Sequence, residues 1–198
     1  MDEDETASET EEARDDIPTE SEILDGITDI SLTPTEHQRV KDVVNGEEMR
    51  RIKGHDRRYL IVGAGGETGA ATRRMTVCNL LGEREDAVAT RLEDFGLTRE
   101  DIKLWTRVFD ILCGRATDIV AVLEDFDGGY VWELGLLFAP SYREKVWVLK
   151  RRYRDEDVER ERFDNGMAAS HTKMLLTGGR CLEWRDEEEL QNAAKSLP

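Results

Sequence analysis

Short apolar runs alternate with amphipathic segments along residues 57–198, which is the pattern of a parallel α/β sheet. Strands are expected where apolar residues are consecutive, at residues 59–62, 87–95, 118–124, 145–150 and 181–184. Helices are expected where apolar residues recur at three- and four-residue spacing, at residues 68–81, 98–114, 131–138, 156–169 and from 186 onward. The run at 118–124 is apolar on both faces, so helices should cover both sides of the sheet.

This alternation predicts one flavodoxin-like or Rossmann-like three-layer α/β domain, with about five parallel strands in the order 2-1-3-4-5. We place the domain at residues 57–198, behind an N-terminal helix and connector at residues 32–56. Thr33 is expected to cap that helix, with Pro34 at its first position and Glu36 at its third.

Charge is spread unevenly along the chain. Residues 1–30 carry thirteen acidic residues and one basic residue, so they contribute −12 of the net charge of −16. They also lack aromatic residues, and the sequence therefore predicts a disordered acidic segment over residues 1–31. The acidic balance and the excess of arginine over lysine fit a halophilic, high-salt protein, although a GC-rich genome explains the arginine equally well. No duplex nucleic acid is expected as a partner, because DNA binding needs a cationic surface.

The three cysteines, Cys78, Cys113 and Cys181, are widely spaced and form no Cys-x-x-Cys motif. Buried free thiols in a reducing cytoplasm are expected, rather than disulfides or a zinc site. No apolar run approaches the length of a membrane span and no signal peptide is evident, so the sequence predicts a cytoplasmic protein with no membrane association. We expect no cofactor and no metal; Mg²⁺ held by Glu124, Asp125 and Asp127 is the weaker alternative.

A glycine-rich stretch follows the first predicted strand. Glycines leave the backbone accessible to a ligand, and the helix that follows offers free N–H groups suited to a phosphate or a ribose. Arg73 and Arg74, one turn into that helix, could add positive charge. The residues expected to bind substrate here are Gly63, Gly65, Gly66, Thr68 and Gly69. An unliganded strand-to-helix turn is the plain alternative, since the spacing departs from Gly-x-Gly-x-x-Gly.

Carboxylates and glycines also follow the third predicted strand. Asp127 should lie on the loop, and Glu133 in the first turn of the next helix, where the helix dipole favours the ionised carboxylate. An ionised carboxylate can attack an electron-poor anomeric carbon, while a second acid assists the leaving group. Gly128 and Gly129 would leave room for a sugar, and two aromatic residues that could flank a base follow them, Tyr130 and Trp132. The alternative is a turn and a helix start that simply favour acids.

These residues resemble the nucleoside 2-deoxyribosyltransferase-like family, which is related in fold to TIR-type NAD hydrolases. The resemblance lies in Asp118-Ile119-Val120, then Asp127, then Glu133-Leu134-Gly135, and covers about residues 57–150. It implies that Glu133 attacks C1′ of the sugar, that Asp127 handles the leaving base, and that Asp118 supports them. The turn after the first strand departs from the family's usual Gly-Pro. A neighbouring subunit completes the site in some members, so a homo-oligomer is compatible with the resemblance.

The sequence therefore predicts cleavage or transfer at the N-glycosidic bond of a nucleoside, nucleotide or NAD-like small molecule, through a carboxylate nucleophile. One alternative is a nucleotide-binding sensor without turnover, which would use the acids only to hold ribose hydroxyls. Another is an NAD(P)-binding Rossmann-type protein, in which Glu93 or Asp94, near the end of the second strand, would bind the adenosine ribose.

Overall fold

The computed structural model describes residues 32–97, 102–126, 130–164 and 166–198. The chain divides into a unit of residues Met1–Gln38 and a unit of residues Arg39–Pro198. The predicted disorder of residues 1–31, and Thr98 as a helix cap, lie outside the described residues.

The predicted start of the first described helix is confirmed. Helix α2 spans Pro34–Asn45. The backbone N–H of Thr33 donates to Glu36 Oε2 at 2.7 Å, and the N–H of Glu36 donates to Thr33 Oγ1 at 3.3 Å. This reciprocal pair is the capping box that the sequence indicates.

The connector predicted before the sheet is in part a further helix, α3, which spans Glu47–Lys53. Met49 and Ile52, three positions apart, are both buried. Helix formation here is stabilised by those two tertiary contacts, since seven residues are too few for a stable isolated helix.

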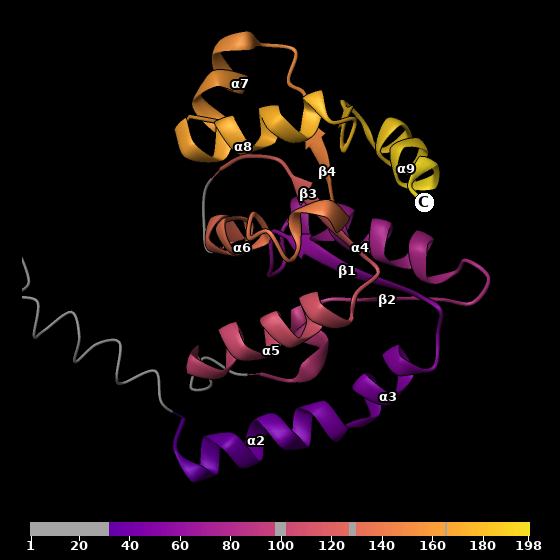
Figure 1. The fold of residues 1–198 in the computed structure, drawn as a ribbon. Helices are drawn as coiled ribbons and strands as arrows, with labels where there is room; N and C mark the ends of the chain where they lie inside the picture. The colour runs from indigo at the N-terminus through magenta and orange to yellow at the C-terminus, as the bar shows by residue number, and fades with distance from the viewer. Residues whose placement is uncertain (1–31, 98–101, 127–129, 165) are drawn as a thin grey trace, which may run out of the picture. The chain divides into compact units, whose positions relative to one another are not determined.

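The sheet has five parallel strands in the order β2-β1-β3-β4-β5, as predicted. Figure 1 labels β2, β1, β3 and β4. The strands are β1 (Arg57–Gly63), β2 (Ala87–Thr90), β3 (Asp118–Leu123), β4 (Val146–Arg151) and β5 (Cys181–Trp184). The strand order reverses beside β1, which lies between β2 and β3. A ligand site in such a sheet is expected at the carboxyl ends of these central strands.

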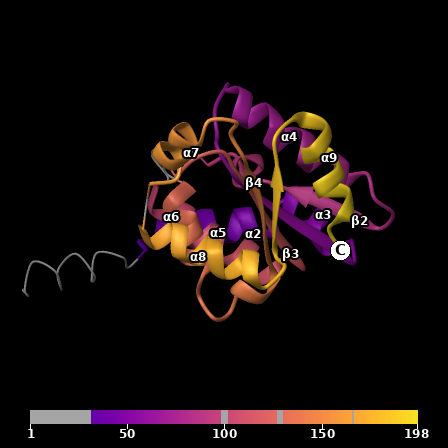
Figure 2. The same cartoon turned by 90° about the horizontal axis from the view of Figure 1, so that it is seen from above.

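Helices cover both faces, which completes the predicted three-layer arrangement (Figure 2). Helices α4 (Gly69–Gly82) and α9 (Glu187–Ser196) lie on one face. Helices α5 (Ile102–Arg115), α6 (Tyr130–Leu137) and α8 (Gly166–Thr177) lie on the other face. Asp186 caps α9, as expected, by accepting from the N–H of Glu189 at 2.9 Å.

Side chains that alternate along the strands build a core on each face. Tyr59 and Ile61 of β1 pack with Val77 and Leu81 of α4 and with Trp184 of β5. The Trp184 indole donates to the Leu149 carbonyl at 3.0 Å. The three cysteines are free and buried, as expected, and burial raises their thiol pKa values to about 11 for Cys78 and Cys181 and about 12 for Cys113.

Two predicted elements are wrong in extent. The strand predicted at residues 87–95 ends at Thr90 and continues as a short 3-10 helix, η1 (Leu92–Phe95), because Asp94 bonds back to Arg91 and Gly96 turns the chain at φ 62°. The helix predicted at residues 156–169 is two helices, α7 (Glu156–Arg162) and α8. Between them the Phe163 ring packs edge-on against Phe126, with centroids 5.0 Å apart.

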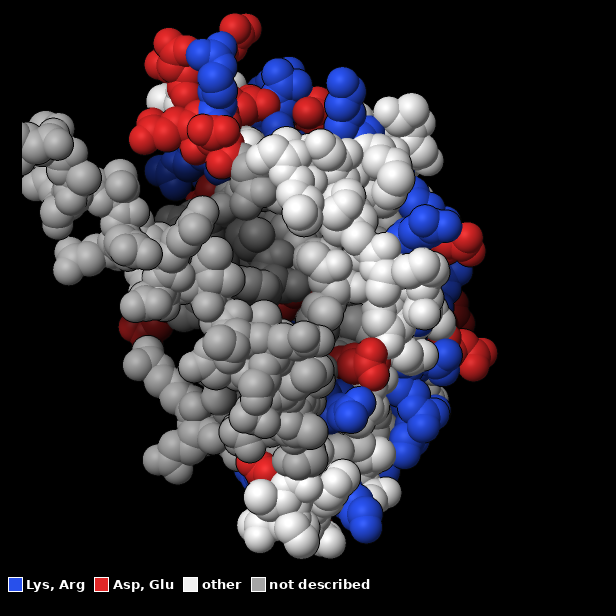
Figure 3. Space-filling view, turned by 60° about the vertical axis from the view of Figure 1, so that its left-hand side comes forward, with Lys and Arg blue, Asp and Glu red and all other residues white. Residues whose placement is uncertain are grey.

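Helix α8 carries little charge. Lys173 is its one charged residue, and Met167 and Met174 are exposed on it. Figure 3 shows charged side chains gathered over α7 and an uncharged surface below them. A short 3-10 helix, η3 (Arg143–Lys145), is also charged at each of its three positions. In the described part of the chain, no helix has both the length and the apolar composition needed to cross a bilayer.

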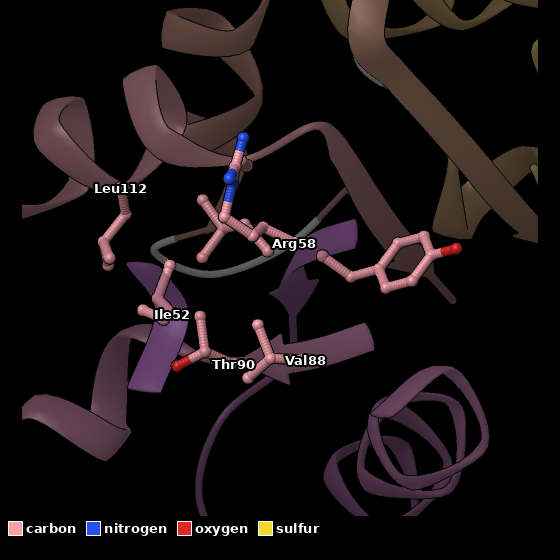
Figure 4. Close-up of a pocket in the computed structure, with 8 residues that line it drawn as sticks. Ile52, Arg58, Val88, Thr90 and Leu112 are labelled. Atoms are coloured by element: carbon pink, nitrogen blue, oxygen red, sulfur yellow. The ribbon is translucent and has the colours of Figure 1, made fainter. Parts of the chain in front are cut away.

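A small cavity lies between β1, β2, α3 and α5 (Figure 4). Its volume is about 10 Å³, and its lining is mostly apolar, with Ile52, Val88 and Leu112 pointing toward it. A cavity of this size holds at most about one water molecule. It is therefore a packing defect and not a ligand site.

Candidate functional site

The two motif-bearing loops leave the same edge of the sheet from adjacent strands. Strands β1 and β3 are parallel neighbours, with Gly63 opposite Val122. The glycine turn after Gly63 and residues 124–126 after β3 therefore start at the carboxyl edge together. Asp127, Gly128 and Gly129 lie outside the described residues, as do the side chains of Tyr130 and Trp132, although both residues belong to α6.

Gly63 has a structural reason to be glycine. Its φ is +146°, and a Cβ placed there would lie 2.6 Å from the Val122 carbonyl oxygen of the neighbouring strand. Gly66 has φ +79°, and a Cβ at its position would meet no atom within 4 Å. Gly65 and Gly66 are both exposed. The first glycine thus permits close strand packing, and the next two leave the turn open to solvent.

Thr68 and Gly69 connect this turn to α4. Thr68 is the N-cap, because its hydroxyl accepts from the N–H of Ala71 at 3.1 Å. Gly69 is the first helical residue, and a Cβ there would come within 3.3 Å of the Arg73 guanidinium. Both predicted ligand-binding residues therefore have identifiable roles in starting the helix.

Arg73 and Arg74 do not provide unpaired positive charge at the glycine turn, contrary to the expectation. Arg73 makes a bidentate ion pair with Glu124, with Nε and Nη2 each 2.6 Å from a carboxylate oxygen. This hydrogen-bonded pairing raises the pKa of Arg73. Arg74 pairs with Glu93 instead, and its Nη1 donates to the Gly63 carbonyl at 3.0 Å. Each guanidinium is thus matched by a carboxylate.

Glu124 is the centre of a buried network on the β3–β4 side. Its second arginine partner is Arg151, and its backbone carbonyl accepts from the Tyr153 hydroxyl at 2.8 Å. Both arginines also lie over the Trp184 ring, at 6.0 and 5.4 Å from its centroid. With both carboxylate oxygens bonded to guanidinium groups, Glu124 is unsuited to hold Mg²⁺. Among the described residues, no group of three or more His, Cys, Asp or Glu side chains could hold a metal ion.

Glu133 is a partly buried acid with a strongly altered pKa. It lies in the first turn of α6. Its pKa is raised from 4.5 to about 7: burial is the largest cause, the negative charge of Glu93 adds to it, and Arg74 opposes both. The expected effect of the helix dipole is therefore outweighed, because an ionised carboxylate that is removed from water loses more hydration free energy than the dipole restores.

Asp118 is not brought to this edge. It is the first residue of β3, opposite Tyr59, and its carboxylate accepts from the Trp147 indole at 3.2 Å. Five residue-to-residue steps along the strand, roughly 16 Å, separate it from Leu123 at the carboxyl end. The supporting role that the resemblance implies for Asp118 is therefore not supported, since an aspartate that opens a parallel strand lies at the opposite edge.

The structure does bring Glu93 and Arg74 to this edge; the sequence suggests Glu93 as a ribose ligand only in the NAD(P)-binding alternative, and Arg74 only as added positive charge. Glu93 follows β2 on η1, and its Oε1 is 3.3 Å from the Cβ position of Gly65. Its neighbour Asp94 is committed to capping η1 through Arg91. The strand order 2-1-3 already predicts that a residue after β2 comes near the glycine turn. We call Gly63, Gly65, Arg74, Glu93 and Glu133 the carboxyl-edge site.

Fold and site together define an open, parallel α/β protein with an acid-bearing site at the carboxyl ends of its central strands. The chain belongs to a family of unknown function (DUF8170), whose model matches residues 8–178. No curated protein matches the chain.

Proposed function

We propose that this protein cleaves, or transfers across, the N-glycosidic bond of a nucleoside, nucleotide or NAD-like ligand, with Glu133 as the nucleophile. The observation that supports this most directly is the pKa of Glu133, raised to about 7 at the carboxyl edge of the sheet. Strongly perturbed pKa values cluster at functional sites, and a pKa of about 7 leaves a large share of Glu133 ionised at neutral pH and able to attack.

The proposed reaction begins with the ionised form of Glu133. One carboxylate oxygen attacks C1′ of the sugar and forms a glycosyl ester, while the bond from C1′ to the base nitrogen breaks. The base leaves with the electron pair of that bond and takes a proton from an acid, which the family resemblance assigns to Asp127. Water, or a second base, then attacks C1′ and gives up a proton to the acid that protonated the first base; the ester bond to Glu133 breaks, which restores its carboxylate and completes hydrolysis or transfer.

The experiment is a screen of nucleosides, nucleotides and NAD for released base, followed by Glu133→Gln. The amide keeps the size of the side chain but removes its charge. Base release should fall by at least about a hundredfold, or roughly 2.7 kcal/mol in the barrier. Glu161→Gln is the matched control, because Glu161 is an exposed acid on α7. Turnover by Glu133→Gln at the wild-type rate would refute the assignment.

A nucleotide-binding sensor without turnover is the second candidate. The open glycine turn favours it, because Gly65 and Gly66 are exposed at the edge where the resemblance places a sugar. Titration calorimetry separates the two proposals. Binding of a nucleotide with no base released from any compound in the screen would favour the sensor.

A further inference from the structure

The ion pair between Arg74 and Glu93 leaves one donor and one acceptor unused. Arg74 is a buried side chain, only 6% exposed, and its two terminal nitrogens bond to Gly63 and to Glu93 Oε1. Its Nε and the other Glu93 oxygen, Oε2, are also buried. Among the described residues, neither atom has a hydrogen-bond partner.

Among the described residues, no other ion pair leaves both a donor nitrogen and a carboxylate oxygen unpaired. Arg91 Nε and Arg151 Nε are also unpaired, but the acids beside them use both of their oxygens. Glu93 Oε2 is the one buried carboxylate oxygen in the described residues without a partner. Native proteins rarely leave a buried charged group unsatisfied, because its lost hydration is not recovered. The ion pair thus lacks a group that accepts a hydrogen bond from Arg74 Nε and donates one to Glu93 Oε2.

The pair lies beside an exposed part of the glycine turn. Glu93 follows β2, and its carboxylate lies beside the exposed turn at Gly65. The Glu93 side chain is 35% exposed overall, so its buried oxygen lies next to solvent-accessible atoms. Helix η1, which carries Glu93, and helix α6, which carries Glu133, both contact β1. A ligand that reaches Glu133 across the end of β1 therefore approaches Glu93 as well.

A hydroxyl is a neutral group that donates and accepts at the same time. We infer that Glu93 Oε2 accepts a hydrogen bond from a ribose hydroxyl of the ligand, so that the carboxyl-edge site takes ribosides in preference to 2′-deoxyribosides. This inference rests on the proposed function, which brings C1′ to Glu133. The carbon next to C1′ carries the hydroxyl that a deoxyriboside lacks. The family resemblance implies a deoxyribose, so the two expectations differ at this atom.

The test compares a riboside and a 2′-deoxyriboside of the same base, adenosine with deoxyadenosine and inosine with deoxyinosine, on the full chain. Base release and binding by titration calorimetry are both measured. Wild type should prefer the riboside by at least about tenfold in kcat/KM, because a site built to bond a hydroxyl rejects the analogue without it. Glu93→Gln should lose most of that preference. If Glu93→Gln does not fold, Arg74→Met/Glu93→Gln removes both charges together, and wild type alone still gives the preference.

The outcomes separate the inference from the proposed function. Equal base release from the riboside and the deoxyriboside, or faster release from the deoxyriboside, overturns the inference and leaves the proposed function standing. In that case an ordered water completes the ion pair. No release, with tighter binding of the riboside, refutes the reaction and supports the ligand contact. Neither release nor binding refutes both. A preference that persists unchanged in Glu93→Gln assigns it to other residues and also overturns the inference.

Discussion

The raised pKa of Glu133 makes stability depend on pH in a direction that a variant can expose. The pKa shifts from 4.5 to about 7, or roughly 2.5 units, and each unit corresponds to about 1.36 kcal/mol. Between these two values the folded protein holds a proton on Glu133 that the unfolded chain has lost. The free energy of unfolding therefore falls as pH rises through this range, by about 3 kcal/mol in total from this one group.

Glu133→Gln removes that pH dependence, because the amide does not ionise and stands in for the protonated acid. Compared with wild type, the variant should be close in stability near pH 4, and more stable by about 3 kcal/mol above about pH 8. Urea unfolding at constant ionic strength, repeated across this pH range, measures the difference. Glu161→Gln should change stability by less than about 0.5 kcal/mol at every pH, since Glu161 is exposed.

A stability difference between wild type and Glu133→Gln that stays flat from about pH 4 to pH 9 would refute the burial argument. A difference that shrank as pH rose would mean that the folded state favours the ionised carboxylate, as the helix dipole alone would dictate. Either result would also remove the main support for Glu133 as a nucleophile. The measurement needs no substrate, so it can be made before any activity is found.

Three further predictions concern reaction and stability. The rate of base release should rise with pH to a plateau, with an apparent pKa of about 7, because attack needs ionised Glu133. A rate that instead falls as pH rises past about 7 would assign Glu133 to proton donation. Gly63→Ala should lower the free energy of unfolding, measured in urea, by more than about 2 kcal/mol, because the new Cβ would meet Val122. Gly114→Ala lies in open space on α5 and should raise it by about 0.5–1 kcal/mol; equal effects of the two variants would contradict this. Arg84→Met should cost about 2 kcal/mol or more by thermal and urea unfolding, because Arg84 bonds four backbone carbonyls in and just after α9; an unchanged midpoint would show those bonds to be unimportant.

The strand order and the edge that carries the site follow from local sequence patterns. Residues 118–124 are apolar on both faces, and only a doubly covered sheet buries such a strand. The glycine turn after β1 and the acids after β3 then meet because parallel neighbours end at one edge. The caps at Thr33 and Asp186 were predictable for the same reason: each is decided by a few adjacent residues.

Contacts between distant residues set the rest of the site. Nothing near Arg73 in the sequence shows that Glu124, fifty-one positions later, takes its charge. The pairing of Arg74 with Glu93 is equally remote, since it needs η1 to fold where a longer strand was expected. Two adjacent arginines thus resemble a phosphate-binding pair in the sequence, but their charges are matched by carboxylates from two different loops.

The pKa of Glu133 shows the same division between local and distant causes. The local signal, an acid in the first turn of a helix, favours the ionised carboxylate. The opposing causes are burial and the charge of Glu93, and both depend on the packing of α6 and η1 around β1. Their sum places the pKa at about 7, so ionised and protonated forms coexist at neutral pH.

Glu93 therefore has two expected effects in the carboxyl-edge site: it makes the Glu133 carboxylate more basic, and it offers its unpaired oxygen to the sugar. Removing Glu93 should accordingly lower the pKa of Glu133 as well as the preference for ribosides, which links the stability measurement to the substrate comparison.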